Sequence, residues 1–211
     1  MSIRIDNVDV YGFEAAIRGM RSPKNSWDKS DSCWSSPNEN GTDKPMYIIG
    51  ENDLKLMHTL AAAGQDHGKF LRMIHVQLDV TAPLYWWKEA DQYKVGTVTD
   101  SCSTMHKIHA KEFTMDDFSH EHLYSPMHDL KPTVDLLNVY RERFIDTKDK
   151  EDWWQLIQLL PSSYNQRRTW DLNYAVLRNI YHARRNHKID EWHTLCDWIE
   201  TLPYAKELIC G

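Results

Sequence analysis

The chain of 211 residues has few cysteines, no long apolar run and no excess of basic charge, and each absence excludes a class of protein. The four cysteines are widely separated and form no Cys-x-x-Cys pair, and there is no signal-peptide pattern, so we expect reduced thiols in a cytoplasm. No apolar run approaches the roughly 20 residues of a membrane helix, which predicts a soluble protein without a membrane partner. The net charge of −6 argues against a nucleic acid polymer as partner, although a local basic pocket for one phosphate is compatible with it.

What the chain does contain is ordinary for a globular protein, apart from its aromatic residues. Hydrophobic residues make up 41% and charged residues 27%, and the length suits one domain over residues 1–211. Nine Trp and ten Tyr stand against five Phe. Such rings pack in cores and also stack on flavins or bases, and core packing is the commoner use.

A long polar stretch around residues 21–44 shows no periodicity and predicts a loop. Loops of this length inside compact domains often act as lids over a ligand, which would involve Arg21, Lys24, Trp27 and Trp34. The alternative is an excursion without function that is held by Trp27 and Trp34 as buried side chains.

Periodicity elsewhere predicts more helices than strands, and therefore a helix-rich α+β fold. Strands are expected at residues 3–10 with a break at Asn7, at 46–49 beside the first strand, and at 93–99. Helices are expected at 13–20, from Asn52 or Asp53 to 63, from 66 with Phe70, Leu71, Ile74 and Leu78 on one face, at 83–90, 132–144 and 153–160, and at 189–202.

One further long helix is expected after Pro161, because proline ends the preceding helix. Trp170, Asn173, Leu177, Ile180 and Tyr181 recur at three- and four-residue steps and would form its apolar face. The basic residues of the same segment would project at other angles or lie near its start: Arg167, Arg168, Arg178, Arg184 and Arg185.

The loop after the strand at 93–99 is rich in hydroxyl groups, with Ser101, Cys102, Ser103 and Thr104 followed by His106 and Lys107. Hydroxyls and backbone amides at a strand end can bind an anion, although a structural turn is the simpler interpretation.

Five histidines between residues 106 and 129 lie close in sequence to four carboxylates, a density that could build a divalent-metal site. His128-Asp129 resembles the pair found in helical metal-dependent phosphohydrolases. The spacing matches no tight metal template, so we interpret the segment as surface histidines without a metal and keep the phosphohydrolase as an alternative.

The C-terminal part resembles the flavin-dependent thymidylate synthases. The resemblance rests on Leu160-Pro161, the Tyr164-Asn165-Gln166 turn, an aromatic residue before Asn173, a helix that ends in Arg184, and Glu191-Trp192 at the start of the last helix. Asn173 and Arg184 match positions that line the family's nucleotide site, whereas Ala175 replaces a family arginine.

The family's signature motif is poorly matched. Its Arg-His-Arg would fall near Tyr93, Lys94 and Val95 or, with a small gap, near Ala90, Asp91 and Gln92. Its later arginine and tyrosine would fall on Met105 and His106. A lost guanidinium removes bidentate phosphate recognition that lysine only partly replaces.

The resemblance implies a mixed sheet flanked by helices, a homotetramer, and the reductive methylation of dUMP. FAD would carry the hydride, with NADPH as reductant and methylenetetrahydrofolate as carbon donor. The nucleotide-binding residues would be Ser101, Ser103, Asn173, Arg178 and Arg184, and the cofactor-binding residues His67, Lys94, His106, Arg167 and Arg168. A non-catalytic nucleotide-binding relative is the alternative on the same fold.

Overall fold

The computed structural model describes residues 3–35 and 45–211, which form two compact units. The first unit contains the described residues of 1–7, together with Leu78–Lys94 and Thr99–Trp170. The second unit contains the described residues of Val8–Gln77, together with Val95–Val98 and Asp171–Gly211. The expectation of one domain over residues 1–211 stays a prediction.

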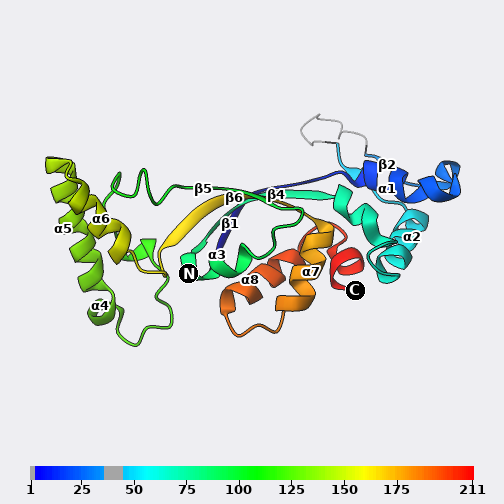
Figure 1. The fold of residues 1–211 in the computed structure, drawn as a ribbon. Helices are drawn as coiled ribbons and strands as arrows, with labels where there is room; N and C mark the ends of the chain where they lie inside the picture. Colours follow the sequence, from blue (N-terminus) through cyan, green and yellow to red (C-terminus); the bar gives the residue numbers. More distant parts are fainter. Residues whose placement is uncertain (1–2, 36–44) are drawn as a thin grey trace. The chain divides into compact units, whose positions relative to one another are not determined.

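A four-stranded sheet has the strand order β1-β4-β6-β5 (Figure 1). The strands are β1 (Arg4–Tyr11), β4 (His75–Pro83), β6 (Asn165–Asn173) and β5 (Val98–Ser101). Val76, Leu78, Val80 and Ala82 of β4 are buried, while the alternate residues are more exposed, as the two-residue period of a strand requires. The break expected at Asn7 is a residue with a φ of 51° inside β1.

The first unit has its own aromatic core. It contains α3 (Leu84–Ala90), α4 (Pro126–Asp129), α5 (Lys131–Thr147), α6 (Lys150–Leu159) and the short 3-10 helix Met115–Asp117. Trp86, Trp87 and Trp170 are buried with ring centroids 4.8, 5.7 and 6.1 Å apart in edge-to-face contacts. A second cluster packs α5 and α6, which lie side by side in Figure 1, onto Ile108, Phe113 and Phe118.

The second unit packs helices around the α7 helix. Its elements are α1 (Phe13–Arg21), the 3-10 turns Ser22–Lys24 and Trp27–Lys29, the paired strands β2 (Cys33–Trp34) and β3 (Tyr47–Ile48), α2 (Glu51–Ala62), η3 (Gly68–Met73), α7 (Tyr174–Arg184), α8 (Asp190–Ile199) and the π-helical turn η5 (Lys206–Cys210). Leu177 and Ile180 of α7 are fully buried together with Leu208 and Ile209 of η5. The C-terminal segment is therefore part of this core.

The helix-rich α+β fold is confirmed, and so are most of the expected helices, but two expected helices were wrong. Residues after 66 form the short 3-10 helix η3 and then strand β4. The apolar residues from Phe70 to Leu78 that suggested one helical face are divided between these two elements. Residues after Pro161 form strand β6 and only then helix α7, so Arg167 and Arg168 lie in a strand.

The expected strands also needed correction. The strand expected at 93–99 is found at Val98–Ser101, and β3 pairs with β2 rather than with the first strand. Helix α2 begins after Gly50, and Asp53, expected as its cap, is fully buried and bonded to Arg21.

Of the polar stretch at 21–44, the part at 36–44 lies outside the described residues. Trp27 and Trp34 are 49% and 55% exposed, so they are not buried anchors of this stretch. In the ranges described, no helix is long and apolar enough to cross a membrane.

Candidate functional site

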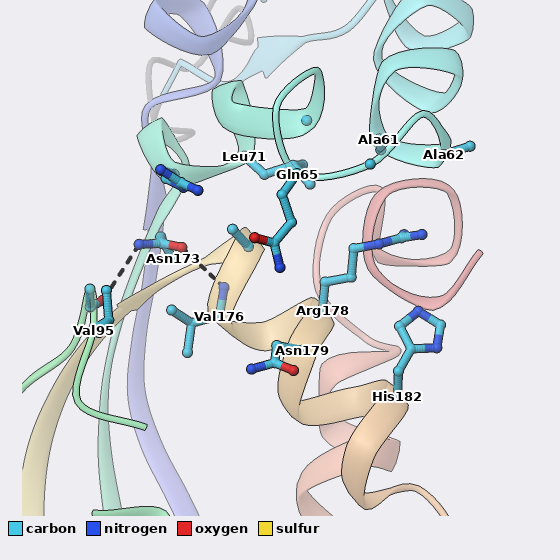
Figure 2. A pocket seen from close by; sticks show the side chains of 15 residues that line it. Ala61, Ala62, Gln65, Leu71, Val95, Asn173, Val176, Arg178, Asn179 and His182 are labelled. Atoms are coloured by element: carbon cyan, nitrogen blue, oxygen red, sulfur yellow. Dashed lines mark hydrogen bonds between the residues drawn. The ribbon is translucent and has the colours of Figure 1, made fainter. Parts of the chain in front are cut away.

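A pocket of about 590 Å³ lies within the second unit (Figure 2). Its lining comes from the end of α2, the turn after it, η3, the residues before β5, and helix α7. The lining residues are Ala61, Ala62, Gly64, Gln65, Gly68, Leu71, Arg72, Val95, Gly96, Asn173, Ala175, Val176, Arg178, Asn179 and His182. The volume falls within the roughly 300–1,000 Å³ of small-molecule sites.

One face of α7 supplies the polar wall of this pocket. Ala175, Arg178, Asn179 and His182 are spaced by three and four residues and therefore lie on the same side of the helix. Figure 2 shows Arg178 and Asn179 on one turn of this face and His182 on the next. The buried residues of α7 occupy the opposite side, so the helix separates core from pocket.

Asn173 fixes the start of α7. Its side-chain oxygen accepts a hydrogen bond from the backbone N–H of Val176 at 3.1 Å, and its amide nitrogen donates to the carbonyl of Gly96 at 3.4 Å (Figure 2). Gly96 has a φ of +77°, and a Cβ atom there would lie 2.9 Å from the Asn173 amide nitrogen. Asn173 thus acts as an N-cap that also holds the loop at the pocket's edge.

Arg178 connects the pocket to the C-terminal segment. Its Nη1 donates to the carbonyl oxygens of Leu208 at 3.1 Å and Ile209 at 3.4 Å. Figure 2 shows the side chain extending from α7 beside the C-terminal turn, which is drawn in red. The guanidinium is therefore held in one orientation at the pocket wall.

The chemistry of the lining suits a nucleotide or flavin. Arg72 and Arg178 carry positive charge, and no Asp or Glu occurs among the described residues of this lining. The amides of Gln65 and Asn179 can bind the edge of a heterocyclic ring, and Leu71, Val95 and Val176 provide apolar contacts. This donor set fits FAD or a pyrimidine nucleotide.

The residues expected to bind nucleotide fall in different places. Asn173 and Arg178 line the pocket, whereas the guanidinium of Arg184 lies 4.8 Å over the ring of Trp192. Ser101 and Ser103 belong to the first unit, where Ser103 Oγ accepts hydrogen bonds from the backbone N–H groups of Met105 and His106. Two of the amides expected to face an anion are thus used inside the loop.

The residues expected to bind the cofactor include two arginines that already have partners. Arg167 donates to Asp79 at 2.6 Å, and Arg168 donates to Asp91 at 2.7 Å while it lies 4.3 Å over the Trp87 ring. Hydrogen bonds from Thr169, Arg167 and Asn7 hold the pKa of the Asp79 carboxyl well below its usual range. His67, Lys94 and His106 are exposed.

The first unit contains a separate cavity of about 450 Å³, with Arg167, Cys102, Lys107 and Tyr164 in its wall. Burial raises the pKa of the Tyr164 phenol, and nearby Asp117 and Cys102 add to the effect. Several basic side chains here are paired with acids, as in the contact of Lys111 with Asp117 at 2.6 Å.

The histidine-rich segment does not form a metal site in the described ranges, where no three His, Cys, Asp or Glu side chains gather around a common point. His128 lies 2.8 Å from the carboxylate of its neighbour Asp129. His109 packs against the Phe144 ring, and burial lowers its pKa. The metal-dependent phosphohydrolase thus lacks a ligand cluster in this part of the chain.

Sequence reasoning missed Gln65, Arg72, Asn179 and His182 as pocket residues. The signal for Asn179 and His182 was their helical spacing from Arg178. That spacing is informative only when α7 is known to begin at Tyr174, because an apolar face that starts at Trp170 combines strand and helix positions. Gln65 and Arg72 lie in a turn and a 3-10 helix, where no periodicity marks them.

Solved structures resemble this chain over nearly its whole length. A flavin-dependent thymidylate synthase ThyX from Helicobacter pylori, complexed with FAD and dUMP, is 16% identical, covers 99% of this chain and 98% of its own, and has a TM-score of 0.67. A second Helicobacter pylori ThyX structure with FAD and dUMP is 14% identical, covers 99% of this chain and 97% of its own, and has a TM-score of 0.72. The fold is that of the flavin-dependent thymidylate synthases.

A UMP/dUMP methylase, PolB from Streptomyces cacaoi bound with 5-Br dUMP, shares the thymidylate synthase fold. It is 14% identical, covers 100% of this chain and 96% of its own, and has a TM-score of 0.64. No family sequence model matches the chain, and no curated protein sequence matches it. The thymidylate synthase fold is therefore visible in the structure and not in overall sequence similarity.

Proposed function

We propose that this protein is a flavin-dependent thymidylate synthase-like enzyme that binds FAD and a pyrimidine deoxynucleotide and carries out the reductive methylation of dUMP or a related C5 modification. The observation that carries the proposal is the thymidylate synthase fold along the whole chain, shared with proteins that contain FAD and dUMP or 5-Br dUMP. NADPH and methylenetetrahydrofolate would be co-substrates. A cytoplasmic homotetramer belongs to the same proposal.

The pocket beside α7 supports the proposal as a candidate binding site. FAD supplies hydride chemistry when bound, so the protein's task is to bind and orient. Arg72 and Arg178 would neutralise phosphate charge, and Gln65 and Asn179 would hydrogen-bond the edge of a ring. Val95, 89% exposed at the pocket, would lose contact with water when a ring covers it.

A second candidate, a nucleotide-binding relative without catalysis, is favoured by the poor signature motif. Met105 stands where the family has an arginine, and Arg167 and Arg168 already form ion pairs within the first unit. The two candidates differ in one measurement, because NADPH should bleach the bound flavin in an active enzyme and leave it oxidised in a protein that only binds.

The binding site is tested by filling the pocket. Ala175 lines it from α7, so Ala175→Trp places an indole in the space that a ligand would occupy. We expect the affinity for FAD or dUMP, measured by fluorescence titration, to fall at least about tenfold, which equals about 1.4 kcal/mol of binding free energy.

The matched control is Ala183→Trp, because Ala183 is exposed on the same helix and does not line the pocket. It should bind as the parent does. Circular dichroism checks that both variants fold. Unchanged binding of FAD and dUMP by Ala175→Trp would show that neither ligand binds in this pocket.

A further inference from the structure

We infer that Arg178 binds a phosphate group of the nucleotide with the free edge of its guanidinium, while the C-terminal turn η5 holds the opposite side, so that phosphate binding and the order of η5 are coupled. This inference deepens the proposed function, since it names the group bound and the segment that responds. It rests on four features of the second unit: the carbonyls of η5, the free donors of Arg178, the charge of the pocket lining, and the anchoring of the chain before η5.

The first feature is the need of η5 for hydrogen-bond donors. The last carbonyls of a helix have no partner within the helix, and buried carbonyls without one are costly. The Leu208 and Ile209 side chains are fully buried, so this end of the chain is part of the core. Arg178 Nη1 donates to both of their carbonyls. The contact therefore stabilises η5 and fixes the plane of the guanidinium.

The second feature is the set of guanidinium N–H donors that η5 does not use. Arginine has five N–H donors, and the two on Nη1 face the η5 carbonyls. Within the described ranges, no hydrogen bond or ion pair uses Nε or Nη2, although Arg178 lines the pocket. These two nitrogens form the parallel edge that binds two oxygens of a phosphate at once.

The third feature is the charge around that edge. The chain as a whole carries −6, yet the described lining of this pocket contains two arginines and no carboxylate. His182 lies one turn after Arg178 on the same face of α7 (Figure 2). A local excess of positive charge in an acidic protein favours an anionic ligand, and the planar fork favours phosphate geometry.

The fourth feature is that the chain before η5 is fixed independently of Arg178. The hydroxyl of Tyr174 donates to the carbonyl of Pro203 at 2.6 Å, and the hydroxyl of Tyr204 accepts from the backbone N–H of Ile49 at 3.0 Å. Loss of the Arg178 contact therefore loosens η5 locally. Conversely, a phosphate that immobilises Arg178 strengthens its hold on η5, because coupling between two sites is reciprocal.

The test compares the parent with Arg178→Lys. Lysine keeps the charge but lacks the planar fork that would bind the η5 carbonyls and a phosphate at the same time. Binding is measured by calorimetry for dUMP, deoxyuridine, FAD and pyrophosphate. We expect dUMP to bind at least about tenfold more weakly to the variant and deoxyuridine to change less than about threefold. Arg185→Lys is the matched control: Arg185 is exposed on the same helical segment, stacks on Tyr181, and should not alter dUMP binding.

Hydrogen exchange measures the coupling on the parent protein itself. Adding dUMP or FAD should slow exchange of the Lys206–Cys210 amides, and deoxyuridine should not. A stronger effect of dUMP assigns the phosphate to the substrate, and a stronger effect of FAD assigns it to the cofactor. This measurement tests the coupling even if Arg178→Lys fails to fold. Unchanged exchange of the Lys206–Cys210 amides with both dUMP and FAD would overturn the coupling.

The outcomes separate this inference from the proposed function. Binding of pyrophosphate that depends on Arg178, without binding of dUMP or FAD, would support the phosphate site and refute the proposed function. Binding of dUMP with equal affinity in the parent and in Arg178→Lys would refute the phosphate site and leave the function standing. Failure of the parent to bind any of these phosphate compounds would refute both.

Discussion

At the scale of single residues, a buried ion pair in the second unit is a contact whose loss should strongly affect stability. Arg21 donates to Asp53 at 2.6 Å, and both side chains are almost completely buried. The other carboxylate oxygen accepts from the hydroxyls of Ser30 and Ser32 at 2.6 and 2.7 Å. Asp53 therefore fixes the segment that follows α1 onto α2. Such a pair adds little to the free energy of unfolding compared with well-packed apolar residues in its place. Removal of one partner, however, leaves a buried charge without a counter-ion.

Replacement of Asp53 by alanine should lower the free energy of unfolding by about 3–5 kcal/mol, because Arg21 would remain buried without its partner. Urea denaturation measures the change. The matched control is Asp28→Ala in the exposed turn of the same segment, which should stay within about 0.5 kcal/mol of the parent. A variant at Asp53 as stable as the control would show that water reaches this pair.

The same residue gives the expected pH dependence. Burial alone would raise the pKa of Asp53, but hydrogen bonds from Ser30, Ser32 and Arg21 outweigh it and lower the pKa below its ordinary value. The contribution of Asp53 is therefore complete above the unfolded-state pKa of about 4 and is lost as pH falls through the lower folded-state pKa. The stability difference between the parent and Asp53→Ala should shrink in that acidic range only.

At the scale of elements, α7 is the helix that defines the candidate site, and its first residues determine which side chains face the pocket. A one-residue shift of its start would rotate Arg178 and His182 away by about 100°. Asn173 prevents this, because its side chain caps the helix and bonds Gly96 at the same time. The capping role follows from the contacts, whereas the role of Asn173 in nucleotide binding stays a prediction.

Replacing Asn173 with alanine should cost about 1 kcal/mol of stability, while Asn173→Ser should retain most of it, because serine is also a good N-cap. Thermal or urea denaturation distinguishes the two variants. If serine and alanine destabilise equally, the bond to Gly96, rather than the cap, would be the main contribution of Asn173.

The elements also show where the sequence was sufficient. The helices α1, α3, α5, α6 and α8 were predictable, because each buries one apolar stripe at helical spacing. Strands β4 and β6 were missed because no glycine or proline marks the boundary with the neighbouring helix. Strand β4 is the next element after η3, and β6 runs directly into α7. Phe70 to Leu78, and Trp170 to Leu177, each gave a helical period by coincidence.

At the scale of the whole molecule, the fold is recognisable although only 14–16% of residues are identical to those of the solved thymidylate synthases and the UMP/dUMP methylase. The residues that suggested the family from sequence explain this. Trp170 is buried among Trp86 and Trp87, Asn173 caps α7, and Trp192 is a core residue of α8. These positions maintain packing. The signature motif is where this sequence departs from the family. The sequence therefore predicted the fold, while the binding residues stay a prediction.

The absorbance spectrum of the purified protein with FAD, before and after addition of dUMP, tests the central claim most directly. The proposed function requires a bound flavin whose visible bands shift when dUMP enters, because cofactor and substrate would occupy adjoining space. A protein that leaves the FAD spectrum unchanged, with and without dUMP, would contradict it and would mean that the thymidylate synthase fold serves another ligand here.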